Sequence, residues 1–220
     1  MQQTIITFPE IRLSARDAHK LRGYFGQLFQ ERSPLLHNHL ESGSGYRYAY
    51  PLVQYKVVEK TPMLIGFLEG AHLLRELFLE IKELDIEGRL YTIQSKYIQC
   101  IEPKIGYATE LLAYQFKTLW MPLNQKNYSR WRDKNPEERK AMLTQLMVNH
   151  ILAAFKGLGH RMSEGEYILA HLDLEARHTQ FKQQKMMAFQ GHFVSNVYLP
   201  NYLGIGKSVS RGFGTVLPKK

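Results

Sequence analysis

Eleven residues near the C-terminus have the composition of an anion-binding loop. They run from Gly204 to Gly214 and read Gly-Ile-Gly-Lys-Ser-Val-Ser-Arg-Gly-Phe-Gly. Glycine lets the backbone approach a phosphate closely, successive backbone N–H groups can form a concave anion site, and the basic and hydroxyl side chains add charge and donors. The sequence therefore predicts a polyanion clamp, with candidate residues Gly204, Gly206, Lys207, Ser208, Arg211, Gly212 and Gly214.

This loop completes neither of two familiar glycine motifs. The segment 206–208 resembles the end of a P-loop, but the first glycine of that motif would fall at Asn201, and no helix can follow before the chain ends. The segment 211–214 copies the start of the RNP1 motif, but only six residues follow it, too few to finish an RNA-recognition fold. A glycine-rich turn between two short strands remains the alternative to a clamp.

A pair of histidines, His37 and His39, is the second feature that could do chemistry. In an extended loop, residues two apart point to the same side, so the two imidazoles could take one proton and deliver another near neutral pH. Such a pair suits RNA self-cleavage, in which a ribose 2′-OH attacks the adjacent phosphorus and the 5′ oxygen leaves. Two alternatives stay open. One is a zinc site, although no acidic or cysteine residue lies at a recognisable ligand spacing, and the other is two solvated loop histidines.

Aromatic and basic residues also alternate between Tyr114 and Lys134. In a protein that binds single-stranded nucleic acid, such rings stack on bases and such cations hold phosphates. The alternative is that Phe116 and Trp120 belong to the core and that the other residues form a solvated loop. The segment decides nothing by itself.

The composition favours a polyanionic partner. The 220 residues include 29 Lys and Arg against 20 Asp and Glu, a formal net charge of +9, and 44% are hydrophobic, enough for a substantial core. We see no signal peptide and no apolar run of about 18 residues, so we expect a soluble, cytoplasmic protein without membrane contact. Cys100 alone can form neither an internal disulfide nor a zinc knuckle, and we expect no metal and no cofactor.

The elements that must position these residues form two halves. In the first half, Ser14 has the position of a helix N-cap with Asp17 three residues later, and the histidine pair lies in the polar loop after that helix. The order strand, helix, strand, strand, helix, strand is that of a ferredoxin-like unit. The expected elements are strands at 4–13, 46–58, 62–68 and 84–92 and helices at 14–29 and 71–82.

The second half repeats this pattern less regularly. Asn135 caps one long helix, which Gly157 ends. Strands are expected at 91–101, 108–121, 167–175, 186–194, 197–199 and 215–217. We predict an α+β protein of two tandem ferredoxin-like (RRM-like) units, each an antiparallel sheet covered by helices. The domains are residues 1–91, with the histidine loop, and residues 92–220, with the glycine loop.

Three features together resemble the CRISPR repeat-processing endoribonucleases of the RAMP superfamily. These are the glycine motif with a basic residue inside, the tandem ferredoxin-like layout, and a histidine in the loop after the first helix. The sequence is most similar to the compact subtype with a His-x-His pair, over essentially the whole chain. The resemblance implies a metal-independent enzyme that binds the repeat of precursor CRISPR RNA and cuts it through the 2′-OH, leaving a 2′,3′-cyclic phosphate.

The resemblance also implies partners and roles for residues. The repeat RNA is the substrate, and the mature guide RNA passes to a CRISPR interference complex. Monomer and dimer both stay open. His37 and His39 would be the general acid and base, and the clamp residues would bind the RNA.

Two departures from the family pattern affect these roles. Many relatives have a lysine shortly after the histidine, whereas residues 40–46 contain none, so Arg47 and Lys56 are the candidates for stabilising charge on the phosphorane. Relatives also often place a tyrosine in the first helix. Tyr24 could answer to it, but its place on the apolar stripe favours a core role.

A second class of function stays open. The protein could be a non-catalytic repeat-RNA-binding or scaffolding subunit of a CRISPR ribonucleoprotein complex, with a glycine loop that binds RNA and incidental histidines. An enzyme should cut a labelled repeat RNA once per repeat, whereas a scaffold should only shift it on a gel.

Overall fold

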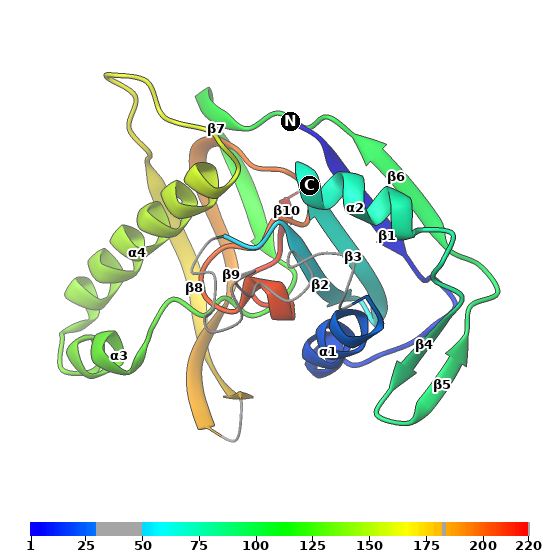
Figure 1. Cartoon of the computed structure of the whole chain (residues 1–220). Coiled ribbons are helices and arrows are strands. Elements are labelled where there is room, and N and C mark those ends of the chain that lie inside the picture. The colour runs from blue at the N-terminus through cyan, green and yellow to red at the C-terminus, as the bar shows by residue number, and fades with distance from the viewer. Residues whose placement is uncertain (30–49, 182–183, 220) are drawn as a thin grey trace, which may run out of the picture. The chain divides into compact units, whose positions relative to one another are not determined.

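The computed structural model describes residues 1–29, 50–181 and 184–219. The chain divides into two compact units, each built around a four-stranded antiparallel sheet (Figure 1). The N-terminal unit comprises Met1–Pro103 with Val209–Gly212, and the C-terminal unit comprises Lys104–Ser208 with Phe213–Lys220. The predicted α+β fold class is confirmed.

The sheet of the N-terminal unit has the strand order β2-β3-β1-β6. The first strand lies inside the sheet, between the third strand and the last, as in a ferredoxin-like unit. The elements of this unit are β1 (Gln3–Thr7), the 3-10 helix η1 (Ala15–Asp17), α1 (Ala18–Leu28), β2 (Val53–Val58), β3 (Thr61–Phe67), α2 (Glu69–Leu77), β4 (Glu83–Ile86), β5 (Arg89–Thr92), β6 (Tyr97–Ile101) and the 3-10 helix η3 (Val209–Arg211).

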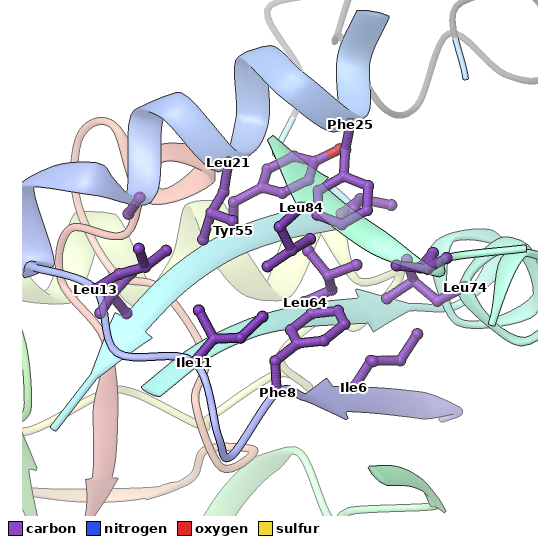
Figure 2. Close-up of a cluster of buried hydrophobic side chains, with 14 of the residues drawn as sticks. Ile6, Phe8, Ile11, Leu13, Leu21, Phe25, Tyr55, Leu64, Leu74 and Leu84 are labelled. Carbon is purple, nitrogen blue, oxygen red and sulfur yellow. The ribbon is translucent and has the colours of Figure 1, made fainter. Parts of the chain in front are cut away.

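An apolar core on one face of this sheet holds both helices (Figure 2). Phe25 of α1 stacks on Tyr55 of β2 with ring centroids 5.9 Å apart, and Leu74 of α2 joins the same cluster. Burial of a side chain the size of Phe25 contributes roughly 1.5–3 kcal/mol. The chain enters α1 through the predicted cap, because the Ser14 N–H donates to Asp17 Oδ2 at 2.9 Å, although η1 forms the first turn.

The segment predicted as one strand at 84–92 is instead the hairpin of β4 and β5. The chain reverses at Gly88, which has φ 82° and donates its N–H to Asp85 Oδ1 at 2.7 Å. The last strand of the main sheet is β6, which pairs with β1. For this reason the N-terminal unit continues to Pro103, whereas the sequence places the boundary between residues 91 and 92.

The sheet of the C-terminal unit has the order β10-β7-β9-β8, which is the ferredoxin-like order again. Between β9 and β10, where such a unit has its second helix, this chain has the glycine loop. The elements of this unit are β7 (Gly106–Phe116), α3 (Gln125–Arg132), α4 (Pro136–Gly157), β8 (Ala170–Phe181), β9 (Gln184–Tyr198) and β10 (Val216–Pro218).

Helix α4 begins as predicted, and α3 is unexpected. The Glu138 N–H donates to Asn135 Oδ1 at 2.9 Å, which completes the predicted cap of α4. Strand β7 ends at Phe116, so the predicted strand at 108–121 is too long. Helix α3 follows. None of its residues is buried, so the sequence contains no apolar stripe from which this helix could be predicted.

Candidate functional site

Three of the predicted site residues, His37, His39 and Arg47, lie outside the described residues. Their roles stay predictions. The structure does describe Lys56, on β2, and the whole glycine loop. The two compact units divide this loop between them, because Val209–Gly212 belongs to the N-terminal unit and the flanking residues belong to the C-terminal unit.

Backbone hydrogen bonds fix the loop within the C-terminal unit. The Ile205 N–H donates to the Gly214 carbonyl at 2.8 Å, which closes the base of the loop. The Lys207 N–H donates to the Met121 carbonyl at 3.1 Å, and the Gly214 N–H donates to the Leu119 carbonyl at 2.8 Å. The loop is therefore attached to the segment that follows β7, and these N–H groups are not available to an anion.

Two glycines of the loop are required by close packing in the same unit. Gly206 has φ 100°, and a Cβ there would lie 2.7 Å from Nε1 of the fully buried Trp120. Gly214 has φ 64°, and a Cβ there would lie 1.9 Å from the Ile205 carbonyl oxygen. Any other residue at these positions would clash and would also hold a left-handed backbone conformation at a cost.

Gly212 has the same function in the N-terminal unit. Its φ is 91°, and a Cβ there would lie 2.6 Å from the Ala18 Cβ and 3.3 Å from the Tyr55 carbonyl oxygen. The sequence argument assigned the glycines to close approach of a phosphate. The structure shows that these glycines allow close packing between segments of the protein, so they do not by themselves indicate a ligand.

The polar side chains of the loop are the groups left for an anion. Lys207, Ser208 and Arg211 are all half-buried and so remain partly open to solvent. Within the described part of the chain, no carboxylate forms an ion pair with Lys207. Ser208 has φ 56°, a strained value for a residue with a side chain, and such strain clusters at binding sites. The role of these side chains as a clamp on a phosphate stays a prediction.

His150 of α4 contacts Trp120, the residue against which Gly206 packs. Its ring meets the Trp120 ring edge-on at 5.9 Å, and no described residue hydrogen-bonds to its buried Nδ1. Burial, and to a smaller extent the charge of Lys207, lowers the pKa of His150 from 6.5 to about 4. The imidazole is therefore neutral at pH 7 and adds no charge to the site.

Lys56 is buried completely. Burial lowers the pKa of its ammonium to about 7, so the group holds its proton only partly at neutral pH. The backbone of Gly212 lies close by, because a Cβ on Gly212 would be 3.7 Å from the Lys56 Cα. A side chain without exposed surface has no direct route to an RNA phosphate. The auxiliary role of Lys56, like that of Arg47, stays a prediction.

Tyr24 connects two elements of the N-terminal unit. Its hydroxyl donates to the Glu83 carbonyl at 3.0 Å, and its ring meets Phe25 edge-on at 5.2 Å. Burial raises the pKa of its phenol. These contacts fit the core role that the sequence pattern favours.

The described residues show no group of three or more His, Cys, Asp or Glu side chains that could hold a metal ion. None of the helices in that part of the chain combines the length and the apolar character needed to cross a membrane.

Two family models cover nearly all of the sequence. The model of the Cas6b N-terminal domain matches residues 1–102, and the model of the Cas6b C-terminal domain matches residues 106–218. The boundary between the two compact units, at Pro103 and Lys104, falls in the short gap between the two matches.

Solved structures of Cas6b agree with this match, and a curated protein is also similar to the chain. A crystal structure of Cas6b is 34% identical over 99% of both chains, with a TM-score of 0.93. A crystal structure of the CRISPR RNA processing endoribonuclease Cas6b is 31% identical over the full length of both chains, with a TM-score of 0.77. The uncharacterized protein MJ0978 of Methanocaldococcus jannaschii is 33% identical over 142 residues, which are 64% of this chain and 96% of that protein.

The lowered pKa of His150 predicts a loss of stability in acid. Between the two pKa values the unfolded state binds the proton and the folded state does not, so stability falls as the pH drops from 6.5 towards 4. From pH 7 to pH 4.5, His150 should remove about 2–3 kcal/mol from the free energy of unfolding, and His150→Leu should abolish this part of the loss.

Urea unfolding followed by tryptophan fluorescence measures this effect in the right unit, because both tryptophans, Trp120 and Trp131, lie in the C-terminal unit. The exposed His171 provides the matched control, since His171→Gln should keep the wild-type pH dependence. The same pH dependence in wild type and His150→Leu would contradict the assignment.

Proposed function

This chain belongs to the Cas6b family, and on that premise we propose that it is an endoribonuclease that binds the CRISPR repeat in precursor CRISPR RNA and cleaves it. The observation that carries the proposal is the match to both Cas6b domains. A full-length relative with a TM-score of 0.77 is a CRISPR RNA processing endoribonuclease, which supports the same activity here. After cleavage, the guide RNA would pass to a CRISPR interference complex.

The proposed chemistry is an attack within the RNA that needs no metal. One imidazole of the pair His37 and His39 removes the proton from the 2′-OH, and the 2′ oxygen forms a bond to the adjacent phosphorus. The bond from phosphorus to the 5′ oxygen breaks, and the other imidazole donates a proton to that oxygen. The products are a 2′,3′-cyclic phosphate and a 5′-OH. Arg47 is the proposed cation for the charge that develops on the phosphorane.

The proposed clamp on the RNA is the glycine loop. The partly exposed side chains of Lys207, Ser208 and Arg211 would hold phosphates, and the packed glycines would keep the loop in one shape. A rigid loop loses little conformational entropy when it binds, so its contacts convert into affinity more fully.

The proposed mechanism makes the 2′-OH indispensable. The protein should cut a labelled repeat RNA once per repeat in EDTA, and it should not cut the same RNA with a 2′-deoxyribose on the 5′ side of the cleavage site, because the nucleophile is then missing. Gel analysis of the products measures both. Cleavage of the deoxy substrate, or a requirement for magnesium, would favour a metal-dependent nuclease. RNA binding without any cleavage would favour a scaffold subunit.

The proposed acid and base should act on rate and not on affinity. His37→Ala and His39→Ala should each slow single-turnover cleavage by ~10²- to 10⁴-fold, the usual contribution of a positioned acid or base, with an unchanged RNA dissociation constant. The double variant should lose less than the product of the two single losses, because the residues act as a unit. Wild-type rates for both single variants would place the catalysis elsewhere.

The proposed clamp predicts a change in salt dependence. The double variant Lys207→Gln/Arg211→Gln should bind repeat RNA more weakly. It should also flatten the slope of log K against log salt by about 1 to 2 units, because binding with fewer phosphate contacts releases fewer counterions from the RNA. Gly206→Ala is the contrasting variant: it keeps the charge and strains the backbone against Trp120, so it should lower stability by about 1–3 kcal/mol without changing the slope. An unchanged slope and affinity in the double variant would mean that the loop is only a turn.

A further inference from the structure

Helix α3 is an addition to the ferredoxin-like pattern of the C-terminal unit, inserted between β7 and α4 (Figure 1). Asn124 caps it by accepting the Asn127 N–H at 2.7 Å. The helix contains Lys126, Arg130 and Arg132 and no acidic residue. A helix that buries no residue contributes little to the core, so its basic composition calls for another explanation.

Three of the basic residues around α3 have partners within the protein. Arg132 forms an ion pair with Asp133 at 3.1 Å, and Lys134 forms one with Glu138 at 3.4 Å. The guanidinium of Arg139 lies 4.8 Å from the centre of the Trp131 ring and donates to the Trp131 carbonyl at 3.1 Å. These cations stabilise the end of α3 and the start of α4.

Lys126 and Arg130 differ from these three. Both are exposed, and within the described residues neither has an ion pair or a hydrogen bond from its side chain. They lie four residues apart and so share one face of the helix, where two like charges repel each other. Tyr128, two residues from each of them, lies on the opposite side of the helix. The exposed face of α3 therefore holds two unneutralised cations that a bound anion would stabilise.

The packed side of α3 connects this helix to the glycine loop. Trp131 meets the ring of Phe189 edge-on at 5.8 Å, and Phe189 in turn contacts Trp120 at 6.1 Å. Trp120 and Phe189 also exchange two backbone hydrogen bonds of 2.8 Å. Trp120 is the residue against which Gly206 packs. Phe189 thus lies between Trp131, through which α3 packs on the unit, and Trp120, against which the glycine loop packs.

We propose that Lys126 and Arg130 of α3 bind phosphates of the RNA, as a second anchor in the same unit as Lys207. This inference rests on the proposed function. The shared aromatic support would keep the two anchors at a fixed spacing, so one RNA strand could contact both. The exposed face of α3 has no large hydrophobic side chain, whereas protein interfaces depend on aromatic anchors, and this favours RNA over a protein partner.

The contact would be to the backbone and not to the bases. Trp131 stacks with Tyr128 at 6.2 Å and is covered by Arg139, so its ring is already occupied within the protein. Phosphate contacts position an RNA without carrying sequence information. The anchor should therefore contribute equally to the binding of repeat RNA and of a scrambled RNA of the same length.

The test compares two double variants that remove the same charge. In Lys126→Gln/Arg130→Gln the unpaired cations are lost, and in Arg132→Gln/Lys134→Gln the paired ones are lost. The first should raise the dissociation constant for a labelled single-repeat RNA about tenfold at physiological salt and flatten the salt plot by about 1 to 2 units. It should raise KM similarly and leave the cleavage rate at saturating RNA unchanged. The control should change affinity by about twofold or less, because its cations remain with Asp133 and Glu138 in the proposed complex and no phosphate contact is lost.

The outcomes separate this inference from the proposed function. A wild-type protein that neither binds nor cuts the repeat RNA would overturn both. If the wild type cuts and the first variant binds both RNAs as the wild type does, only the inference fails, and a protein partner for this face would give that same result. Equal losses in the two variants would also overturn it, since net charge alone would then explain the effect. Equal melting temperatures exclude unfolding as the cause.

Discussion

The backbone of Gly206 packs against the edge of the buried Trp120 indole, and this contact sets the shape of the glycine loop. Trp120 has no exposed surface, stacks on Phe116 at 5.6 Å and leaves Gly206 no room for a Cβ. Because Trp120 is fixed by the core of the C-terminal unit, the loop that crosses it is fixed as well, and Lys207 follows directly. The position of a cation thus depends on the packing of an aromatic core, which resists deformation far better than a solvated loop would.

The same constraint recurs at the other end of the loop, in the N-terminal unit. Gly212 packs against Ala18 at the start of α1 and against the backbone of Tyr55, and both of those residues belong to the main core of that unit. The short helix η3 and Gly212 therefore belong to the unit of α1 and β2, whereas loop residues 204–208 and 213–214 belong to the unit of β7 and β10. A mutation in either core should disturb the loop residues of its own unit without changing a residue that we propose to bind RNA.

The sequence predicts the parts of this protein that follow a strong local rule. The caps at Ser14 and Asn135 depend on short-range hydrogen bonds, and the ferredoxin-like order depends on hydrophobic periodicity. The structure confirms both. The sequence does not reveal the turn at Gly88, because the strand-like alternation of Leu84, Ile86 and Leu90 with polar residues continues across it. It does not reveal α3, because that helix has no apolar stripe. The close packing of Gly206 against Trp120 joins residues far apart in sequence, so no local pattern could reveal it.

The net charge from the composition and the pairing of individual cations in the structure give different information about binding. A net charge of +9 predicts a polyanionic partner but does not say which cations serve it. Around α3, three cations interact with other groups of the protein and stabilise the local fold: Arg132, Lys134 and Arg139. They are therefore less available to a ligand. Lys126 and Arg130 repel each other without such compensation. A basic surface is therefore better described by its unpaired cations than by its total charge, because only these gain a partner when an anion binds.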